Sequence, residues 1–402
     1  MTIPPFTRSF TQQEPIPEDA IAAAIEVMRS GRLHRYNTAP GEESQVAALE
    51  REVAAWQGSA YALACASGGA ALRMALRAAG IGTDDVVLTN AFTLAPVPGA
   101  IVAVGARAVL VEIDENLCLD LDDLQAKIEL FKPAAVMASH MRGHLCDMDR
   151  LTDICRAAKI PLIEDCAHTM GARWRGRRSG SFGLAGAFST QTYKHLNSGE
   201  GGILVSDDPD FMARAIILSG SYMLYGRHGA APPERHFSDA RLEIPNMSAR
   251  MDNLRAAILR PQLARIEDAA SRWNQRYEAV ARRLSDNPAL VLPHRPAAET
   301  FIGSSIQFRI PAISGEAAQR FVQDSARLGV ELKWFGAAEP VGFTSAHRSW
   351  HYVAPQSLPR TDAVLAGLFD MRLPLTFSLE DCDHIGRIIA ACAPSLAAAE
   401  RQ

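Results

Sequence analysis

The stretch Pro161-Leu162-Ile163-Glu164-Asp165-Cys166-Ala167-His168 decides the fold class, because an apolar strand ends there in two acidic residues. Further short β-like runs, each ending in small or polar residues, are Tyr61–Ala66, Val86–Thr89, Ala108–Val111 and Ala134–Ser139. Helical patterns such as Ala70–Ala79 and Met148–Ala158 lie between these runs. Strands that alternate with helices predict an α/β domain with a largely parallel sheet.

The chain has 402 residues, which is too long for one simple core, so we expect a large and a smaller domain. Helical patterns flank the alternating region at 17–30, 43–56 and 248–287, the last with an expected break near Pro261. Strand-like and helical runs mix after residue 288, at Ser305–Ile310, Gly315–Leu328 and Leu379–Ala391. We predict a large α/β domain over residues 1–250, and a linking helix with a small α+β domain over 251–402.

The composition argues against several classes of protein. A net charge of −4 and a pI of about 6.3 indicate neither a nucleic-acid footprint nor a membrane-surface bias. The seven cysteines are scattered and form no C-x-x-C pair, which is typical of a reducing compartment rather than of a disulfide framework. The uncharged run Val86–Ala106 contains Asn90 and two prolines, so we interpret it as strand, loop and buried helix rather than a membrane span. Residues Met1–Gln12 do not resemble a signal peptide, and we expect a cytoplasmic protein.

The turn Ser67-Gly68-Gly69 joins the first β-like run to a helix. Such a turn offers free backbone N–H groups and the positive end of a helix to an anion. It matches neither the nucleotide P-loop nor the G-x-G-x-x-G pattern of dinucleotide sites. The alternative is a tight turn that binds no ligand.

Asp165 is expected beyond the carboxyl end of its strand, where ligands of open α/β sheets bind. A carboxylate aimed into that crevice would favour a protonated pyridinium over a neutral ring, and the charged ring of a pyridoxal cofactor is an electron sink. A helix cap or a surface acid is the alternative interpretation of the pair Glu164-Asp165.

Lys194 lies between a small-residue strand near Ala187–Ser189 and the glycine cluster Gly199-Glu200-Gly201-Gly202. Desolvation and a nearby positive charge would lower its pKa and make it a Schiff-base-forming amine. Once released, the same amine could move a proton between the α-carbon of a substrate and the cofactor. A solvated surface lysine is the alternative.

These segments, in this order, resemble the sugar aminotransferases of the DegT/DnrJ/EryC1/StrS family, which are fold-type I pyridoxal-phosphate enzymes. The residues that carry the resemblance are Ile163–His168, Gly171–Arg173, Gly176-Arg177, Gly180–Gly183, Phe188-Ser189, Lys194 and Gly199–Gly202. It runs from about Ser30 to Ala257, and more loosely to the C-terminus. The resemblance implies a mostly parallel sheet of the seven-stranded type between helices, a small C-terminal α+β domain, and a homodimer with shared active sites.

The resemblance also implies a role for each matching residue toward pyridoxal 5'-phosphate. Lys194 would form the Schiff base, Asp165 would contact the ring nitrogen, and His168 would lie beside the ring and its phenolic oxygen. Ser189 and the turn Gly68-Gly69 would bind the phosphate.

Three positions depart from the family pattern. Gly69 stands where a threonine is common, so a hydroxyl contact is lost. Leu94 replaces the aromatic residue that covers the cofactor ring and would give apolar cover, unless Phe92 swings in. Either Asn246 or Ser248 is expected to reach across to the phosphate site of the partner subunit.

Candidate substrate contacts follow a predicted helix and precede a proline-rich loop, a setting in which specificity residues are common. They are Tyr222, Tyr225, Arg227 and His228, and His34 and Tyr36 are a similar case. Arg250 could bind the donor's carboxylate through two hydrogen bonds. An ordinary surface loop, and a structural salt bridge for Arg250, are the alternatives.

Two other clusters are interpreted as structural. The run His140–Asp147 contains metal-ligand residue types but no established zinc spacing, so we expect no metal. The basic run Arg173–Arg178 has an aromatic residue inside it, as nucleic-acid sites often do, but we expect a hairpin face.

The resemblance implies an aminotransferase that works by a ping-pong mechanism. The amino donor would be glutamate or glutamine, and the acceptor a nucleotide- or phosphate-linked keto-sugar or a cyclitol ketone. Two alternatives stay open. A sugar dehydratase or decarboxylase could use the same cofactor, although Lys194 favours transamination. A non-catalytic binding protein could keep the fold, although the intact Lys194, Asp165 and Ser189 argue against it.

Overall fold

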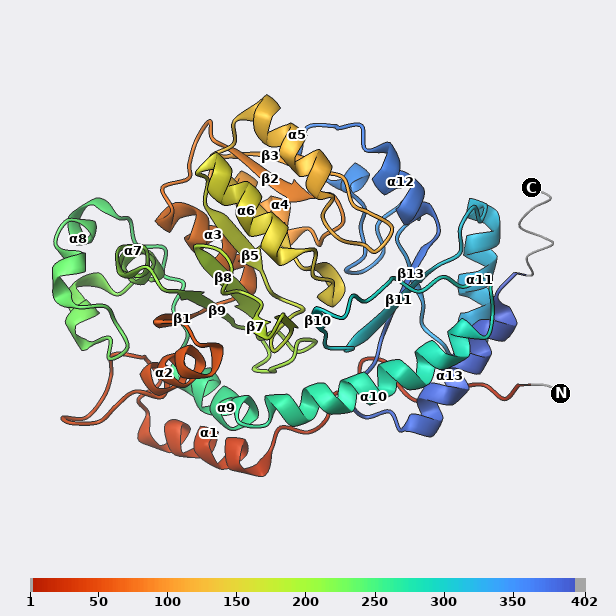
Figure 1. Cartoon of the computed structure of the whole chain (residues 1–402). Coiled ribbons are helices and arrows are strands. Elements are labelled where there is room, and N and C mark those ends of the chain that lie inside the picture. Colours follow the sequence, from red (N-terminus) through yellow and green to blue (C-terminus); the bar gives the residue numbers. More distant parts are fainter. Residues whose placement is uncertain (1–2, 395–402) are drawn as a thin grey trace.

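The computed structural model describes residues 3–394 and contains a central seven-stranded sheet between helices (Figure 1). The order of the strands is β1-β9-β8-β5-β4-β2-β3. Their bounds are β1 Tyr61–Cys65, β2 Val86–Asn90, β3 Arg107–Val111, β4 Ala135–Ser139, β5 Leu162–Asp165, β8 Ala185–Ser189 and β9 Gly202–Ser206. The strands from β8 to β3 pair in parallel, whereas β9 is antiparallel to β8 and β1. The predicted α/β fold with a mostly parallel sheet is confirmed.

Alternate residues of the strands point to opposite faces of the sheet, and each face has its own helices. One face packs against α3 Gly68–Ala78, α4 Pro96–Ala103 and α7 Pro209–Ser219. The other face packs against α2 Gln45–Gln57, α5 Leu121–Phe131, α6 Met148–Ala158 and α9 Asn253–Leu263, and α1 Glu18–Ser30 lies on α9. Ile163 therefore belongs to the first core, and its neighbour Leu162 to the core under α5 and α6.

A second core lies around the three-stranded antiparallel sheet β11-β13-β12. Its strands are β11 Ser305–Arg309, β12 Lys333–Trp334 and β13 Leu368–Arg372, and its helices are α10 Ile266–Ser285, α11 Gly315–Arg327 and α13 Leu379–Cys392. Phe6 and Phe10 pack edge-on against Phe377 in this core, each with a centroid separation of 5.0 Å. The N-terminal segment runs beside α10 and α13 (Figure 1), so both ends of the chain contribute to the second core.

The break in the long helical region lies at Ala264–Arg265, between α9 and α10, and not at Pro261. Pro261 lies inside α9, where a proline removes one backbone donor. The helix continues past it because the next two residues are held in place. Gln262 donates a hydrogen bond of 2.8 Å to the carbonyl of Asn197, and Leu263 is buried.

The basic run forms the predicted hairpin of β6 Arg173–Trp174 and β7 Arg177–Arg178, which β10 Glu299–Thr300 extends into a small sheet. The two turn residues, Arg175 and Gly176, have φ angles of 48° and 82°, as a two-residue hairpin turn requires. Arg178 lies 3.9 Å over the ring of Trp56 and pairs with Glu267 at 2.8 Å. This arginine is therefore engaged within the chain.

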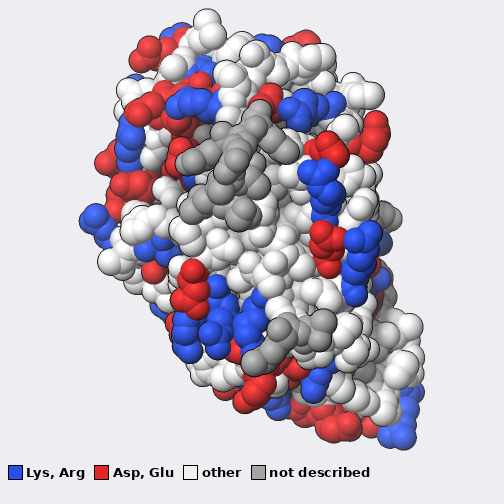
Figure 2. Space-filling view, turned by 90° about the vertical axis from the view of Figure 1, so that its right-hand side faces the viewer, with Lys and Arg blue, Asp and Glu red and all other residues white. Residues whose placement is uncertain are grey.

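The remaining helices are α8 Ala240–Glu243 and α12 Pro359–Ala366, with short 3-10 turns at Met141–Gly143, Tyr222–Arg227, Glu234–Phe237 and His347–Ser349. On the face that carries α11 and α13, basic and acidic side chains are intermingled (Figure 2). Arg283 and Arg387 both pair there with Asp383, at 2.6 and 3.2 Å. No helix within residues 3–394 is both long and apolar enough to cross a membrane. All seven cysteines are free thiols.

Candidate active site

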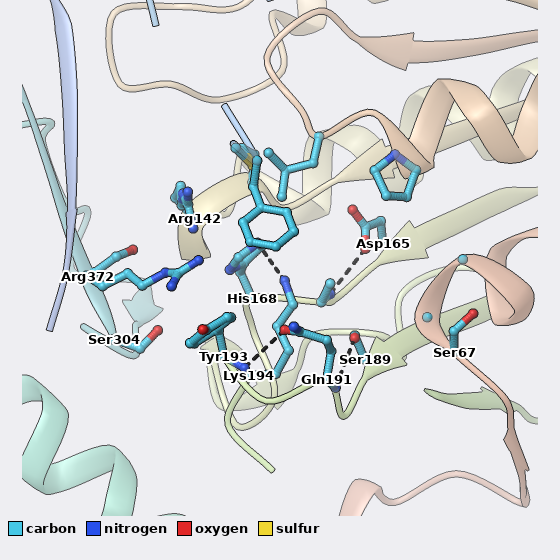
Figure 3. A pocket seen from close by; sticks show the side chains of 18 of the residues that line it. Ser67, Arg142, Asp165, His168, Ser189, Gln191, Tyr193, Lys194, Ser304 and Arg372 are labelled. Atoms are coloured by element: carbon cyan, nitrogen blue, oxygen red, sulfur yellow. Dashed lines mark hydrogen bonds between the residues drawn. The ribbon is translucent and has the colours of Figure 1, made fainter. Parts of the chain in front are cut away.

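A cavity of about 410 Å³ lies where the carboxyl ends of β5 and β8 face the second core (Figure 3). Seven of the residues predicted to bind the cofactor line it, namely Gly68, Gly69, Leu94, Asp165, His168, Ser189 and Lys194. The polypeptide brings them there from four places: the turn after β1, the loop after β2, the end of β5 and the end of β8. The position beyond the strand ends is the one that the fold class predicts for a ligand.

Lys194 follows β8 in a compact loop, in which its backbone N–H donates to the carbonyl of Gln191 at 2.8 Å. Its Nζ atom lies 2.9 Å from Nε2 of His168 (Figure 3). Burial lowers the pKa of Lys194 to about 7, and the positive charge of Arg142 adds to this, while Asp165 opposes it. About half of the Lys194 side chains are therefore neutral amines near pH 7, which is the form that reacts with a carbonyl group.

His168 is the hydrogen-bond partner of this amine. Burial and the adjacent Lys194 lower the pKa of His168 well below its usual value, so its imidazole is neutral. A neutral ring nitrogen can accept a hydrogen bond. His168 thus orients the Lys194 amine and adds no positive charge beside it.

Asp165 is the last residue of β5 and is buried. Its Oδ2 atom accepts a hydrogen bond of 2.7 Å from the hydroxyl of Ser139, which in turn accepts one of 2.7 Å from Thr93. The backbone N–H of Ala167 donates to Oδ1 at 3.1 Å. These donors fix the carboxylate of Asp165 at the cavity wall.

Glu164, the neighbour of Asp165, points to the opposite face of the sheet and has a structural role. Its two carboxylate oxygens accept hydrogen bonds from the backbone N–H groups of Gly180, Phe182 and Gly183, at 2.7 to 3.0 Å. The alternation of a strand therefore divides the acidic pair, with one carboxylate holding the loop after the hairpin and the other facing the cavity.

Metal-ligand residue types also meet behind the cavity, where side-chain atoms of His140, Glu164 and Cys166 lie within 4.8 Å of one another. His140 Nε2 lies 3.1 Å from Glu164, whose oxygens already accept backbone hydrogen bonds, and burial raises the pKa of the Cys166 thiol well above its usual value. His144, from the same run, lies 2.8 Å from the amide oxygen of Gln307. We interpret this group as a hydrogen-bonded part of the interior.

The N-terminus of the eleven-residue helix α3 lies at the other end of the cavity. Ser67 caps this helix by accepting a hydrogen bond of 3.0 Å from Ala70 N–H, and Ser189 lies beside the turn. A Cβ atom at Gly68 would lie 2.8 Å from Cβ of Ser189, so the close approach of β8 requires a glycine at this position. Free N–H groups, two hydroxyls and the helix dipole together favour a phosphate.

Leu94 lines the cavity and provides its apolar cover. Phe92 does not swing in, because its side chain is 1% exposed and packs edge-on against Phe335 with a centroid separation of 5.0 Å. The amide of Asn90 also holds the Phe92 carbonyl at 3.0 Å. The interior beneath the loop therefore fixes Phe92, and of these two residues only Leu94 lines the cavity.

The predicted substrate contacts lie outside the lining of this cavity. Arg250 donates to the carbonyl of Gly220 at 2.7 Å and lies 5.6 Å over the ring of Tyr222. The side-chain oxygen of Asn246 accepts a hydrogen bond of 2.8 Å from Ser248 N–H, and both residues are exposed.

His228 and Arg227 belong to a buried network next to this loop. His228 is 1% exposed and lies 3.1 Å from Glu50, which also pairs with Arg35 at 2.7 Å. Arg227 donates to the carbonyl of Tyr36 at 2.9 Å, and the Tyr36 hydroxyl lies 3.0 Å from His228. The network anchors the segment before α2 to the turn after α7.

Several lining residues were not predicted from the sequence. They are Gln13, Met141, Arg142, Gln191, Tyr193, Trp273, Ser304, Phe343 and Arg372. Most come from the second core or from loops that face it, and they reach the cavity only through tertiary contacts. For Tyr193 a local signal was present, since it directly precedes Lys194.

Comparison with known proteins gives a consistent result. The sequence matches the model of the DegT/DnrJ/EryC1/StrS aminotransferase family over residues 15–391. GDP-perosamine synthase from Caulobacter vibrioides is 30% identical over 85% of this chain and 88% of its own length. L-glutamine:scyllo-inosose aminotransferase from Streptomyces griseus is 32% identical over 68% of this chain and 64% of its own length. The crystal structure of 3-amino-5-hydroxybenzoic acid synthase superposes with a TM-score of 0.82 and 25% identity, covering 97% of this chain and 99% of that one.

Proposed function

The chain belongs to the DegT/DnrJ/EryC1/StrS aminotransferase family, and on that premise we propose that its cavity holds pyridoxal 5'-phosphate and transfers an amino group from glutamine or glutamate to a ketone. The acceptor is a keto-sugar, linked to a nucleotide or a phosphate, or a cyclitol ketone. One observation carries this proposal: a single cavity is lined by the amine of Lys194, the carboxylate of Asp165, and the turn at the start of α3 with Ser67, Gly68 and Ser189 (Figure 3).

The residues present fit the proposed cofactor. The helix end and the hydroxyls of Ser67 and Ser189 suit a phosphate dianion. The buried carboxylate of Asp165 suits a protonated pyridine nitrogen, and Leu94 suits the apolar face of the ring. Lys194 offers an amine with a lowered pKa to the aldehyde.

When bound, pyridoxal phosphate supplies an aldehyde that condenses with amines and a charged ring that accepts the electron pair of the donor's α-C–H bond. Asp165 would contact the ring nitrogen, where a carboxylate would favour the positively charged form of the ring. Lys194 Nζ would hold the cofactor's aldehyde in the resting enzyme and, as a free amine, would accept the proton of the donor's α-carbon and release it again. His168 positions the Lys194 amine for both transfers.

The overall reaction balances without another oxidant or reductant. At the donor carbon the C–N bond breaks, and the carbon is oxidised by two electrons to a ketone with an oxygen from water. At the acceptor carbon a C–N bond forms, the carbon is reduced by two electrons, and the carbonyl oxygen leaves as water.

The relatives support the substrate classes. The name of the Streptomyces griseus relative specifies L-glutamine and a cyclitol ketone, and that of the Caulobacter vibrioides relative a nucleotide-linked sugar. A neutral Lys194 amine in the cavity favours transamination over sugar dehydration or decarboxylation, because proton transfer to and from the α-carbon is the step that transamination needs.

We also propose a homodimer that shares its active sites. Tyr222, Met223 and Leu242 are exposed by 58%, 61% and 77%, and such large apolar side chains favour burial by a second copy. Asn246 and Ser248 lie on the same segment of the chain. In the dimer, one of them is expected to reach the phosphate site of the partner, and Tyr222, Arg227 and Arg250 are expected to border the shared substrate region. His228, a candidate from the sequence, is instead buried within the chain.

The first test is the absorption of purified protein with pyridoxal phosphate, before and after addition of L-glutamine or L-glutamate. We expect a long-wavelength band of the lysine-bound cofactor that disappears with donor and is absent from resting Lys194→Ala. Lys159→Arg, at an exposed helix end, is the matched control and should behave as wild type. A folded wild-type protein without this band would contradict the proposed cofactor, and a band that neither donor bleaches would contradict the proposed donors.

A further inference from the structure

The cavity has a strongly cationic end, opposite Ser67 and Ser189. Arg142 and Arg372 lie together at that end with Ser304, and Lys194 lies between the two ends (Figure 3). With the cofactor's phosphate held at Ser67 and Ser189, as proposed, a substrate amine beside Lys194 would extend its other groups toward these arginines.

One acidic residue pairs with two cations here. Asp370 is fully buried, and its Oδ2 atom pairs with Arg142 at 2.8 Å and with Lys333 at 3.2 Å. Its Oδ1 atom accepts a hydrogen bond of 2.8 Å from Gln307. No salt bridge joins Asp370 to Arg372 among the described residues, although both point to the same face of β13.

Arg372 has no acidic partner within salt-bridge distance among residues 3–394. Its guanidinium lies 3.8 Å over the ring of Tyr193 and 5.9 Å from the centroid of Phe343. Arg372 also makes a side-chain hydrogen bond with Tyr193, and its other N–H groups are left for a planar, two-oxygen partner. Because Tyr193 directly precedes Lys194, this contact ties Arg372 to the loop that carries the reactive amine.

Arg142 supplies a second unused donor. Its side chain is 6% exposed, and its Nε atom is buried without a hydrogen-bond partner among the described residues. Arg142 also has a positive φ of 56°, a strained conformation for a residue that is not glycine, and strain of this kind is frequent at functional sites. Two guanidiniums with unused donors therefore line the same end of the cavity.

We infer that Arg372, assisted by Arg142, binds the α-carboxylate of the amino donor, with Asp370 as the positioning residue that holds Arg142. The inference rests on the proposed function and specifies its donor site. A carboxylate on the α-carbon matches the guanidinium edge in shape and charge, and it places the α-C–H bond next to Lys194. Arg250, the residue expected from the sequence, is occupied by the carbonyl of Gly220.

The test uses the full-length enzyme loaded with pyridoxal phosphate, and follows the loss of the cofactor band with increasing L-glutamine. Arg372→Gln should raise the half-saturating concentration of L-glutamine by roughly 10- to 100-fold, the range expected for a hydrogen-bonded charge pair. The cofactor band itself should be unchanged. Propylamine, a donor without a carboxylate, should react equally with wild type and variant. Arg309→Gln, on the neighbouring strand β11 and outside the cavity lining, is the matched control and should leave half-saturation unchanged.

A measurement on wild type covers the case in which the variant does not fold. Propanoate should compete with L-glutamine, and propanamide at the same concentration should not. If wild type reacts with L-glutamine but Arg372→Gln reacts with the same half-saturation, the inference is wrong while the proposed function stands. It is also wrong if the variant is impaired only in the reaction of its aminated form with scyllo-inosose, or if propanamide competes as well as propanoate. If wild type itself does not react with L-glutamine or L-glutamate, the proposed function fails first.

Discussion

The lowered pKa of Lys194 makes a quantitative prediction about how the cofactor-free enzyme captures pyridoxal phosphate. The pKa falls from 10.5 to about 7, chiefly because burial disfavours the charged amine. At pH 7.5 an ordinary lysine is neutral in about 0.1% of molecules, whereas a lysine of pKa 7 is neutral in about 75%. The concentration of reactive amine is therefore several hundred times higher than on the protein surface.

Stopped-flow absorption measures this effect directly. Cofactor-free protein is mixed with pyridoxal phosphate between pH 5.5 and 10.5, and the rate of band formation is recorded. The rate should fall about tenfold for each unit below pH 7 and level off above it, because only the neutral amine reacts. Nα-acetyl-lysine in the same buffers is the control, and its rate should still rise above pH 9. A midpoint for the protein above pH 9 would refute the reasoning.

The same shift has a consequence for stability in the cofactor-free protein. Between pH 7 and 10.5 the unfolded chain holds a proton on Lys194 that the folded chain lacks, so stability rises with pH in that window. Burial of Lys194 therefore lowers the free energy of unfolding by its full amount below pH 7, where a shift of this size corresponds to about 5 kcal/mol. This loss of stability disappears above pH 10.5. Lys194→Met should therefore raise the free energy of unfolding more at pH 6 than at pH 9, by about 3 kcal/mol in urea titrations. If Lys194→Met raised the free energy of unfolding equally at both pH values, the charge of Lys194 would not be the origin of the stabilisation.

Three substitutions test other parts of the site. Ser139→Ala removes the hydroxyl that donates to Asp165 and should slow the reaction with donor about tenfold while the protein stays folded; an unchanged rate would deny this hydrogen bond a role. Gly68→Ala places a Cβ atom 2.8 Å from Cβ of Ser189 and should weaken cofactor retention on dialysis about tenfold or more, whereas full retention would argue against phosphate binding at this turn. Glu164→Gln leaves three backbone N–H groups without a charged acceptor and should lower the free energy of unfolding by about 2 to 4 kcal/mol in urea, and a neutral outcome would contradict the structural role.

The cofactor end of the site could be predicted from the sequence because each of its residues follows a strand of the sheet. Parallel strands place their carboxyl ends at one edge, so Asp165, His168, Ser189 and Lys194 had to meet once the strands were recognised. The antiparallel strand β9 was not predicted, because an apolar run does not encode its direction in a sheet.

The cationic end could not be predicted for a different reason. Arg142 and Arg372 are far apart in the sequence and meet only when β13 packs near the loop after β4, with Asp370 as the bridge. Neither arginine lies in a motif that distinguishes it from the many arginines of the chain. Arg250 was a better candidate from its position in the sequence, but the nearby Gly220 carbonyl uses its donor.

The participation of Phe6 and Phe10 in the second core sets an order of events during synthesis. These two rings pack against Phe377, so they leave the ribosome long before their partner exists. At about 5 to 20 residues per second the delay is roughly 20 to 70 s, during which two large apolar side chains stay without the core that buries them. The first segment of the chain to be synthesised is thus among the last to pack into its core. The nascent protein carries an exposed aromatic pair through most of its translation, at the stage when holding chaperones and off-pathway association compete for such side chains.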